Sequence, residues 1–421
     1  MLLLRNIAQV ITLRGGPIPR VGASMSDLGI IENGAVLIHG DRIVWVGHTK
    51  DIPVRDPSIR YQTLDGIGLD LIALPGFVDS HTHPIFAKGR AEDFDLCIRG
   101  KSREDIAAAG GGIAAVIAQL RSATVNQLLE RVEARFRQFL SHGTTTIEAK
   151  SGYGSSWEEE IKNIQMLAAL RSRSRLEVVP TFLGAQPCNR ESASARAEYI
   201  REIIEVMIPR VAQEGLAQFC DVFCEHAHFT VEEARSILLA GRKAGLGLKV
   251  HAEKLEHSGG AKLAAELGAR SADHLQYIDD SDIGALKRAG TVATLLPGTS
   301  FHSGSMHYAP ARKLIESGVP VALASNFNPI SCFSMNMQVI LAIACTQMKM
   351  TPAEAVTAAT VNGAFALGVS ERLGTIEENK QADIVLMDVS DYRELPYAFG
   401  VNHCVITIKK GNIVINRLEQ H

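Results

Sequence analysis

Eight short apolar segments alternate with amphipathic helical segments through the middle of the chain. The apolar segments read LPGFVD, TTTIEA, EVVPTFL, CDVFCE, GLKVHA, SADHL, TVATLL and PVALAS. Most are continuous apolar runs, which is typical of parallel strands buried on both faces. Eight strand–helix units over roughly 300 residues predict an α/β fold, a (β/α)8 TIM-type barrel. A doubly wound open sheet is the alternative, because a strand count does not show that a sheet closes.

Helix-start signals fall between these segments. Each is a threonine followed three residues later by Gln or Glu, the spacing of a capping box in which each side chain accepts from the other residue's backbone N–H. The pairs are Thr124 with Gln127, Thr230 with Glu233, and Thr351 with Glu354. They predict three helices that begin directly after these threonines.

The two ends of the chain have a different pattern, with short β-rich runs and turns. GAVLIHGDRIVWVGH contains two such runs around Gly40 and Asp41, which is a hairpin signal. ADIVLMD and CVITIKKGNIVINR, near the C-terminus, repeat this character. We therefore predict one small β-sandwich domain built from residues 1–72 and 373–421, and a barrel domain over residues 73–372.

Composition and charge exclude several classes of function. The 43 Lys and Arg residues against 46 Asp and Glu give a formal net charge of −3, so there is no electrostatic basis for binding nucleic acid or an anionic membrane. The longest apolar runs are far shorter than a membrane span, and the N-terminal MLLLRNIAQVITL is predicted to be a strand rather than a signal peptide. Seven scattered cysteines favour a reducing, cytoplasmic location. We expect Cys220 and Cys224 to be buried strand residues rather than zinc ligands.

Histidines stand at the carboxyl ends of four predicted strands, where the chemistry of a barrel is located. His81 and His83 end strand 1, and a spacing of two on extended chain lets both bind one metal ion. Strand 4 ends in EHAH, His251 lies at the end of strand 5, and His274 ends strand 6. A single histidine at a strand end is commonly structural, but this repetition predicts a metal site.

Longer stretches resemble the amidohydrolase superfamily, and within it imidazolonepropionase, the ring-opening enzyme of histidine breakdown. They include LPGFVDSHTHPIFAKGR, GTTTIEAKSGYG, GGAKLAAELGARSADHL, PVALASNFNP and GTIEENKQADIVLMD, and they cover nearly the whole chain in the family's order. The resemblance implies hydrolysis of a small heterocycle that carries a carboxylate. It also implies one divalent metal ion, for which we expect zinc, with iron as the alternative. The matching residues are His81, His83 and His251 for the metal, His274 for catalysis, and Arg90 and Tyr153 for the substrate's carboxylate and ring. Asn326 stands at the position of the fourth metal ligand.

Four positions depart from the family's pattern, and all lie in the predicted site. Asn326 replaces the aspartate that touches the metal and takes the proton of the attacking water, Lys254 replaces a catalytic glutamate, Gln186 replaces a substrate-binding histidine, and Arg103 replaces a tyrosine. Asparagine cannot accept that proton, and the first two changes make the site more positive by about two charges. The base is then expected to be His274, or Lys254 with a lowered pKa. Alternatively, Lys254 points to solvent.

These departures favour a diverged relative over a standard imidazolonepropionase. We expect a metal-dependent hydrolase of an imidazolone or thiohydantoin ring with a propionate arm, such as a 3-(5-oxo-2-thioxoimidazolidin-4-yl)propionate desulfhydrase that releases sulfide in ergothioneine degradation. The alternatives are ring opening of 4-imidazolone-5-propionate to N-formimino-glutamate, and binding of metal or ligand without turnover. We also expect a homodimer. Five more histidines on the same face have no assigned role: His226, His228, His257, His302 and His307.

Overall fold

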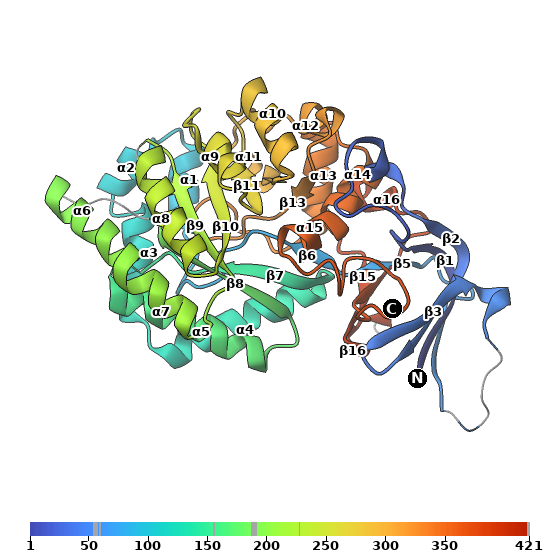
Figure 1. The fold of residues 1–421 in the computed structure, drawn as a ribbon. Helices are drawn as coiled ribbons and strands as arrows, with labels where there is room; N and C mark the ends of the chain where they lie inside the picture. The colour runs from blue at the N-terminus through green and yellow to red at the C-terminus, as the bar shows by residue number, and fades with distance from the viewer. Residues whose placement is uncertain (54–57, 59, 155, 187–191, 227, 419–421) are drawn as a thin grey trace.

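Eight parallel strands form one sheet in which each strand pairs with the next along the chain (Figure 1). The computed structural model describes residues 1–53, 58, 60–154, 156–186, 192–226 and 228–418, apart from the side chain of Arg103. The strands are β6 (Phe77–Asp79), β7 (Thr144–Lys150), β8 (Glu177–Ala185), β9 (Phe219–Cys224), β10 (Gly247–Ala252), β11 (Ser271–His274), β12 (Val292–Leu295) and β13 (Val321–Leu323). All eight lie within or overlap the predicted apolar segments. Cys220 and Cys224 are buried free thiols on β9, as expected.

The ends of the first and last strands meet. The backbone N–H of His83 donates to the carbonyl of Phe327 at 2.8 Å, and that of Asn326 donates to the carbonyl of His81 at 3.1 Å. Thr82 and Phe327 form a parallel bridge. These contacts bring β13 beside β6, so the sheet is nearly closed into a barrel and the predicted (β/α)8 fold is confirmed.

Helices surround this sheet, and the predicted capping boxes begin three of them. Thr124, Thr230 and Thr351 each accept a hydrogen bond from the backbone N–H three residues later, before α4, α8 and α14. The helices that connect or follow the barrel strands, apart from four short ones at the pocket, have these bounds: α4 (Val125–Ser141), α5 (Trp157–Arg173), α6 (Ala193–Glu202), η3 (Ile203–Met207), α7 (Ile208–Gln213), α8 (Val231–Lys243), α9 (Gly260–Glu266), α10 (Asp280–Ala289), α12 (Ala311–Ser317), α13 (Met337–Met348), α14 (Pro352–Ala358) and α15 (Val361–Ala366). Within the described part of the chain, no helix is long and apolar enough to cross a membrane.

Four short helices follow barrel strands β6 and β12 at their carboxyl ends. Three of them, α1 (Ala91–Ile98), α2 (Arg103–Ala108) and α3 (Gly112–Ser122), separate β6 from α4. The fourth, α11 (Pro297–His302), follows β12 directly. Their side chains wall the pocket described below.

Both chain ends build a second, mixed sheet beside the barrel, and both termini lie there (Figure 1). Its strands are β1 (Leu2–Ile11), β2 (Ile30–His39), β3 (Arg42–His48), β4 (Gln62–Asp65), β5 (Ile72–Pro75), β14 (Ile384–Met387), β15 (Cys404–Lys409) and β16 (Asn412–Asn416). The predicted hairpin at Gly40 and Asp41 joins β2 to β3. The remaining short helices are η1 (Gly22–Ser26), η2 (Thr49–Asp51) and α16 (Glu394–Tyr397). The limits 1–72 and 373–421 of this domain stay predictions.

A half-buried ion pair joins the barrel to the second sheet. Glu177, the first residue of β8, lies 2.9 Å from the Arg372 guanidinium and 3.5 Å from the Lys409 ammonium. Burial alone would raise the pKa of Glu177, but Lys409 and Arg372 outweigh it and lower the pKa to about 2. The pair therefore stabilises the contact between the two units at neutral pH.

Candidate active site

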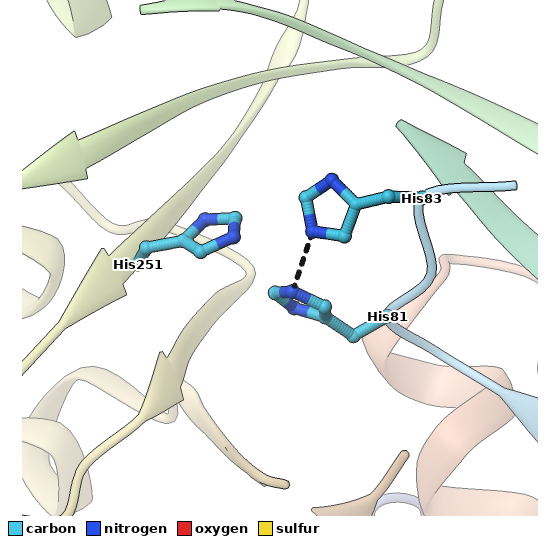
Figure 2. A group of neighbouring side chains, drawn as sticks. All are labelled: His81, His83 and His251. Atoms are coloured by element: carbon cyan, nitrogen blue, oxygen red, sulfur yellow. Dashed lines mark hydrogen bonds between the residues drawn. The ribbon is translucent and has the colours of Figure 1, made fainter. Parts of the chain in front are cut away.

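Three histidines predicted as metal ligands come together at the carboxyl ends of β6 and β10. A ring nitrogen of His81, one of His83 and one of His251 lie within 4.8 Å of one another, and all three side chains are buried (Figure 2). The Nε2 atoms of His81 and His83 are 3.3 Å apart. In a tetrahedral zinc site with bonds of ~2.0–2.1 Å, neighbouring ligand atoms lie about 3.3 Å apart. The spacing thus fits a shared metal ion.

The far side of two of these rings faces a carboxylate. His81 Nδ1 is 2.7 Å from Asp273 Oδ2, and His251 Nδ1 is 3.0 Å from Asp221 Oδ2. Burial lowers the pKa of His81 well below its usual value, so the ring is neutral and its Nδ1 carries the proton that the carboxylate accepts. The lone pair of His81 Nε2 then faces His83, which is the tautomer a metal ligand needs.

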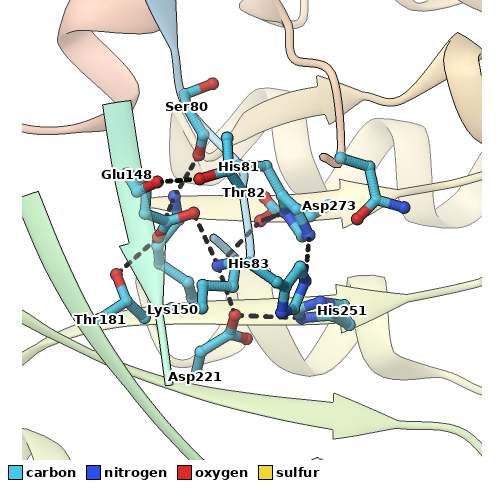
Figure 3. Close-up of polar contacts among 12 residues, drawn as sticks. Ser80, His81, Thr82, His83, Glu148, Lys150, Thr181, Asp221, His251 and Asp273 are labelled. Carbon is cyan, nitrogen blue, oxygen red and sulfur yellow. Dashed lines mark hydrogen bonds and ion pairs between the residues drawn. The ribbon is translucent and has the colours of Figure 1, made fainter. Parts of the chain in front are cut away.

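Beneath the histidines lies a buried ionic network (Figure 3). Lys150 contacts Asp221 and Glu148, and Lys249 contacts Glu148 from the other side. Burial by itself lowers the pKa of Lys150, but the neighbouring Asp221 and Glu148 carboxylates raise it above its usual value. Lys150 is therefore charged despite being buried.

Asn326 lies where the sequence places it, just after β13 at the base of the site. Its side chain is buried, and its backbone has φ 54°, in the left-handed region that asparagine tolerates. Nδ2 donates to Thr299 Oγ1 at 2.7 Å. The amide oxygen is then the atom left to face an ion or a substrate, since a cation is bound by oxygen and not by an amide nitrogen.

The predicted catalytic residue His274 lines the pocket. The side chain is buried, and neither ring nitrogen has a hydrogen-bond partner among the described residues. Its ring centroid is 5.4 Å from that of His251. Burial, followed by the positive charge of Lys254, lowers the pKa of His274 well below its usual value. A neutral imidazole with open nitrogens can accept a proton from a bound water or substrate.

Lys254 lines the same pocket instead of lying apart from it. Its Nζ lies 5.3 Å from the centroid of the Phe223 ring, and the side chain is half-buried. Glu225 Oε1 accepts from the backbone N–H of Lys254 at 2.5 Å and fixes the loop that carries it. The Lys254 side chain thus forms part of the pocket wall.

Tyr153 and Gln186 both line the pocket and are in contact with each other. Gly152 permits this arrangement: its φ is 114°, and a Cβ there would lie 2.5 Å from Gln186 Oε1. Burial raises the pKa of Tyr153 above its usual value, so the hydroxyl stays protonated and can donate to a substrate.

Of the two predicted arginines, Arg90 lies behind the pocket wall. Arg90 makes a bidentate pair with Asp93, at 3.1 Å from Nε and 2.6 Å from Nη2. Asp93 lines the pocket, so Arg90 stands one residue behind its wall. Arg103 begins α2, and its side chain lies outside the described part of the structure.

The pocket encloses about 320 Å³ and has an outer wall that sequence reasoning missed. Helices α1 to α3 supply most of that wall, through Phe94, Cys97, Ile106, Ala107 and Ile113. These side chains are ordinary apolar residues of short helices, and no pattern in the sequence marks them as functional. The exception is the short sequence GGGI at residues 110–113, which also resembles the family, because its Gly112 and Ile113 both line the pocket.

The five unassigned histidines divide into two groups. His228 and His302 line the pocket, and the His228 ring stacks on Phe223 with centroids 4.0 Å apart. The other three have partners away from it: His226 pairs with Glu256, His257 with Asp282, and His307 with the carbonyl of Gln276.

Comparison with known proteins identifies the family. Residues 72–414 match the amidohydrolase family. The chain belongs to the amidohydrolase family. Imidazolonepropionases of Geobacillus kaustophilus and Parabacteroides distasonis are each 43% identical to it, over 418 and 412 residues that cover 99% and 98% of this chain and 98% of each relative. That of Alkaliphilus metalliredigens is 39% identical over 415 residues, 99% of this chain and 98% of the relative. The chain is therefore an imidazolonepropionase-like, metal-dependent hydrolase.

Solved amidohydrolase structures share the fold. An adenosine deaminase from Xanthomonas campestris with bound zinc superimposes with a TM-score of 0.73 at 18% identity, over 99% of this chain and 93% of that one. An atrazine chlorohydrolase from Arthrobacter aurescens complexed with zinc gives a TM-score of 0.65 at 17% identity, over 99% and 96%. At such identities the likeness supports the barrel alone.

Proposed function

We propose that this amidohydrolase is a desulfhydrase that acts on 3-(5-oxo-2-thioxoimidazolidin-4-yl)propionate and releases sulfide. The observation that carries the proposal is the charge of the pocket. Asn326 is neutral at the base of the site, and Lys254 adds a cation to its wall. A positive pocket stabilises a reaction in which negative charge develops on a leaving sulfur atom.

The reaction replaces sulfur by oxygen and keeps the ring closed. Water adds to the C=S carbon, the C–S bond then breaks, and sulfur leaves as hydrosulfide while a C=O bond forms. The balance is thioxo ring plus water to oxo ring plus hydrogen sulfide, with no oxidant or reductant. A divalent ion held by His81, His83 and His251, which we propose to be zinc, would supply the Lewis acidity that activates the water.

Different residues of the pocket accept the proton, stabilise the developing charge and bind the substrate. His274, neutral and buried, accepts the proton of the attacking water. The Lys254 ammonium stabilises the negative sulfur and donates a proton to it as it leaves, and the hydroxyl proton lost as the C=O bond forms returns Lys254 to its ammonium form. Tyr153 and Gln186 hold the ring, and Arg90 or Arg103 supplies the cation for the propionate. Arg90 must turn from Asp93 to do so, or reach the carboxylate with its remaining N–H groups.

Ring opening of 4-imidazolone-5-propionate is the second candidate, and the identity of about 40% to imidazolonepropionases supports it. The metal-loaded protein should be assayed with the imidazolone, thiohydantoin and hydantoin propionates, for both sulfide and N-formimino-glutamate. Sulfide from the thiohydantoin without ring opening of the imidazolone is the expected result. N-formimino-glutamate as the main product would overturn the proposal. The cytoplasmic location and the homodimer stay predictions.

A further inference from the structure

The two carboxylates behind the metal ligands share one lysine. Lys150 Nζ lies 2.6 Å from Asp221 Oδ2 and 3.7 Å from Asp273 Oδ2. Those same two oxygen atoms face the rings of His251 and His81. The side chain of Lys150 comes from β7 and thus connects partners on β9 and β11 across the inside of the barrel (Figure 3).

The second buried lysine has different contacts. Lys249 Nζ lies 2.9 Å from Glu148 Oε1 and 3.0 Å from the carbonyl oxygen of Ser80. Among the described residues it forms no ion pair within 4.0 Å with Asp221 or Asp273, although its charge acts on Asp273 at longer range. Lys150 is therefore the lysine within ion-pair distance of both carboxylates, hydrogen-bonded to Asp221 and 3.7 Å from Asp273.

We propose that Lys150 is a positioning residue for the metal centre, which holds Asp221 and Asp273 so that they fix the ring orientations of His251 and His81. Two buried carboxylates that face the same barrel axis repel each other, and a cation between them sets the place of both. The inference rests on the metal-dependent site proposed above. Asn326 contributes no charge, so the two carboxylates that face the rings of His81 and His251 supply the negative charge behind the ion.

The test is Lys150→Met, with metal affinity as the readout. Loss of a group that orients metal ligands costs roughly 10–100-fold in affinity, so the dissociation constant for zinc, measured by chelator competition, should rise by about that factor. The absorption spectrum of the cobalt-loaded variant should also differ from that of the wild type, because the ligand geometry changes. Thr181→Val is the matched control: Thr181 is equally buried and donates to Glu148 at 2.6 Å, but is not hydrogen-bonded to either aspartate. Its affinity and cobalt spectrum should match the wild type.

A double variant separates positioning from charge balance. The network of two lysines and three carboxylates has a formal net charge of −1. Lys150→Met alone changes this net charge to −2. Lys150→Met combined with Glu148→Gln restores −1, so the double variant avoids misfolding caused by an additional uncompensated buried charge. The double variant should fold and still bind zinc weakly. Wild-type affinity in either variant would overturn the proposal. This test measures metal affinity and not sulfide release, so its result does not depend on whether the proposed reaction is correct. A wild-type protein that binds no metal ion would overturn the metal site itself.

Discussion

Replacing Asn326 with Asp tests whether the site is built for a reaction that leaves charge on sulfur. The side chain is buried, and the φ of 54° at this position is one that Asp adopts as readily as Asn. Thr299 Oγ1, which accepts from Asn326 Nδ2 at 2.7 Å, can instead donate to a carboxylate. The substitution therefore adds one charge and leaves the local hydrogen bond in place.

The size of the effect follows from that charge. A unit negative charge about 4 Å from the leaving sulfur, at an effective dielectric constant of about 20, raises the energy of a full charge there by roughly 4 kcal/mol. With about half a charge developed on sulfur in the transition state, the barrier rises by about 2 kcal/mol, which is about 30-fold in kcat. We expect Asn326→Asp to release sulfide about 30-fold more slowly than the wild type, while binding metal at least as tightly.

The assay is the initial rate of sulfide release at equal metal loading, with N-formimino-glutamate followed in parallel. Asn326→Ala is the control, because it removes the amide without adding a charge. Asn326→Ala should bind the metal more weakly. Once loaded with metal, it should not show the slower sulfide release that the Asp charge causes by repelling the leaving sulfur. Sulfide release by Asn326→Asp as fast as by the wild type would refute the charge argument. Ring opening that appears only in the Asp variant would show that the asparagine disables an ordinary imidazolonepropionase.

Three further predictions concern the metal, the substrate and stability. His251→Ala should take up well under one metal ion per chain by elemental analysis, whereas His226→Ala, which changes an exposed side chain away from the pocket, should bind as the wild type does. Arg90→Ala should raise KM by the equivalent of roughly 2–4 kcal/mol for a carboxylate substrate, with metal content unchanged, and an unaltered KM in steady-state kinetics would exclude this role. Glu177→Gln should lower the free energy of unfolding of the metal-free protein by up to about 3 kcal/mol at pH 7. Because the folded pKa of about 2 lies below the usual value of 4.5, this stabilisation is present above pH 4.5 and is lost as the pH falls toward 2. In urea unfolding, the difference in free energy of unfolding between the wild type and Glu177→Gln should therefore be smaller at pH 3 than at pH 7. An equal difference at both pH values would contradict the lowered pKa of Glu177.

The barrel could be predicted from the sequence because its strands are buried on both faces. A run such as CDVFCE or PVALAS reads as a strand without reference to any partner. The capping boxes could also be read from the sequence because they are local, since Thr124 and Gln127 each accept from the other's backbone N–H within one turn. The convergence of His81, His83 and His251 was predictable as well, because the carboxyl ends of all barrel strands meet at one face.

The surroundings of the ligands could not be predicted in this way. Lys150, Asp221 and Asp273 interrupt apolar strands, and such charges signal an internal network, but the sequence does not show which acid meets which base. The pocket's outer wall depends on how α1 to α3 fold back over the barrel mouth. In the same way, loop conformation decides that His228 lines the pocket whereas His226, two residues earlier, pairs with Glu256.

A single turnover of the metal-loaded wild type in ¹⁸O-labelled water distinguishes sulfide release from ring opening. The substrate is 3-(5-oxo-2-thioxoimidazolidin-4-yl)propionate, and both products are measured by mass spectrometry and sulfide capture. We expect one sulfide per chain turned over and a closed hydantoin ring with one ¹⁸O atom at the former C=S carbon. An opened ring that keeps its sulfur, or an absence of sulfide beside rapid ring opening of 4-imidazolone-5-propionate, would contradict it.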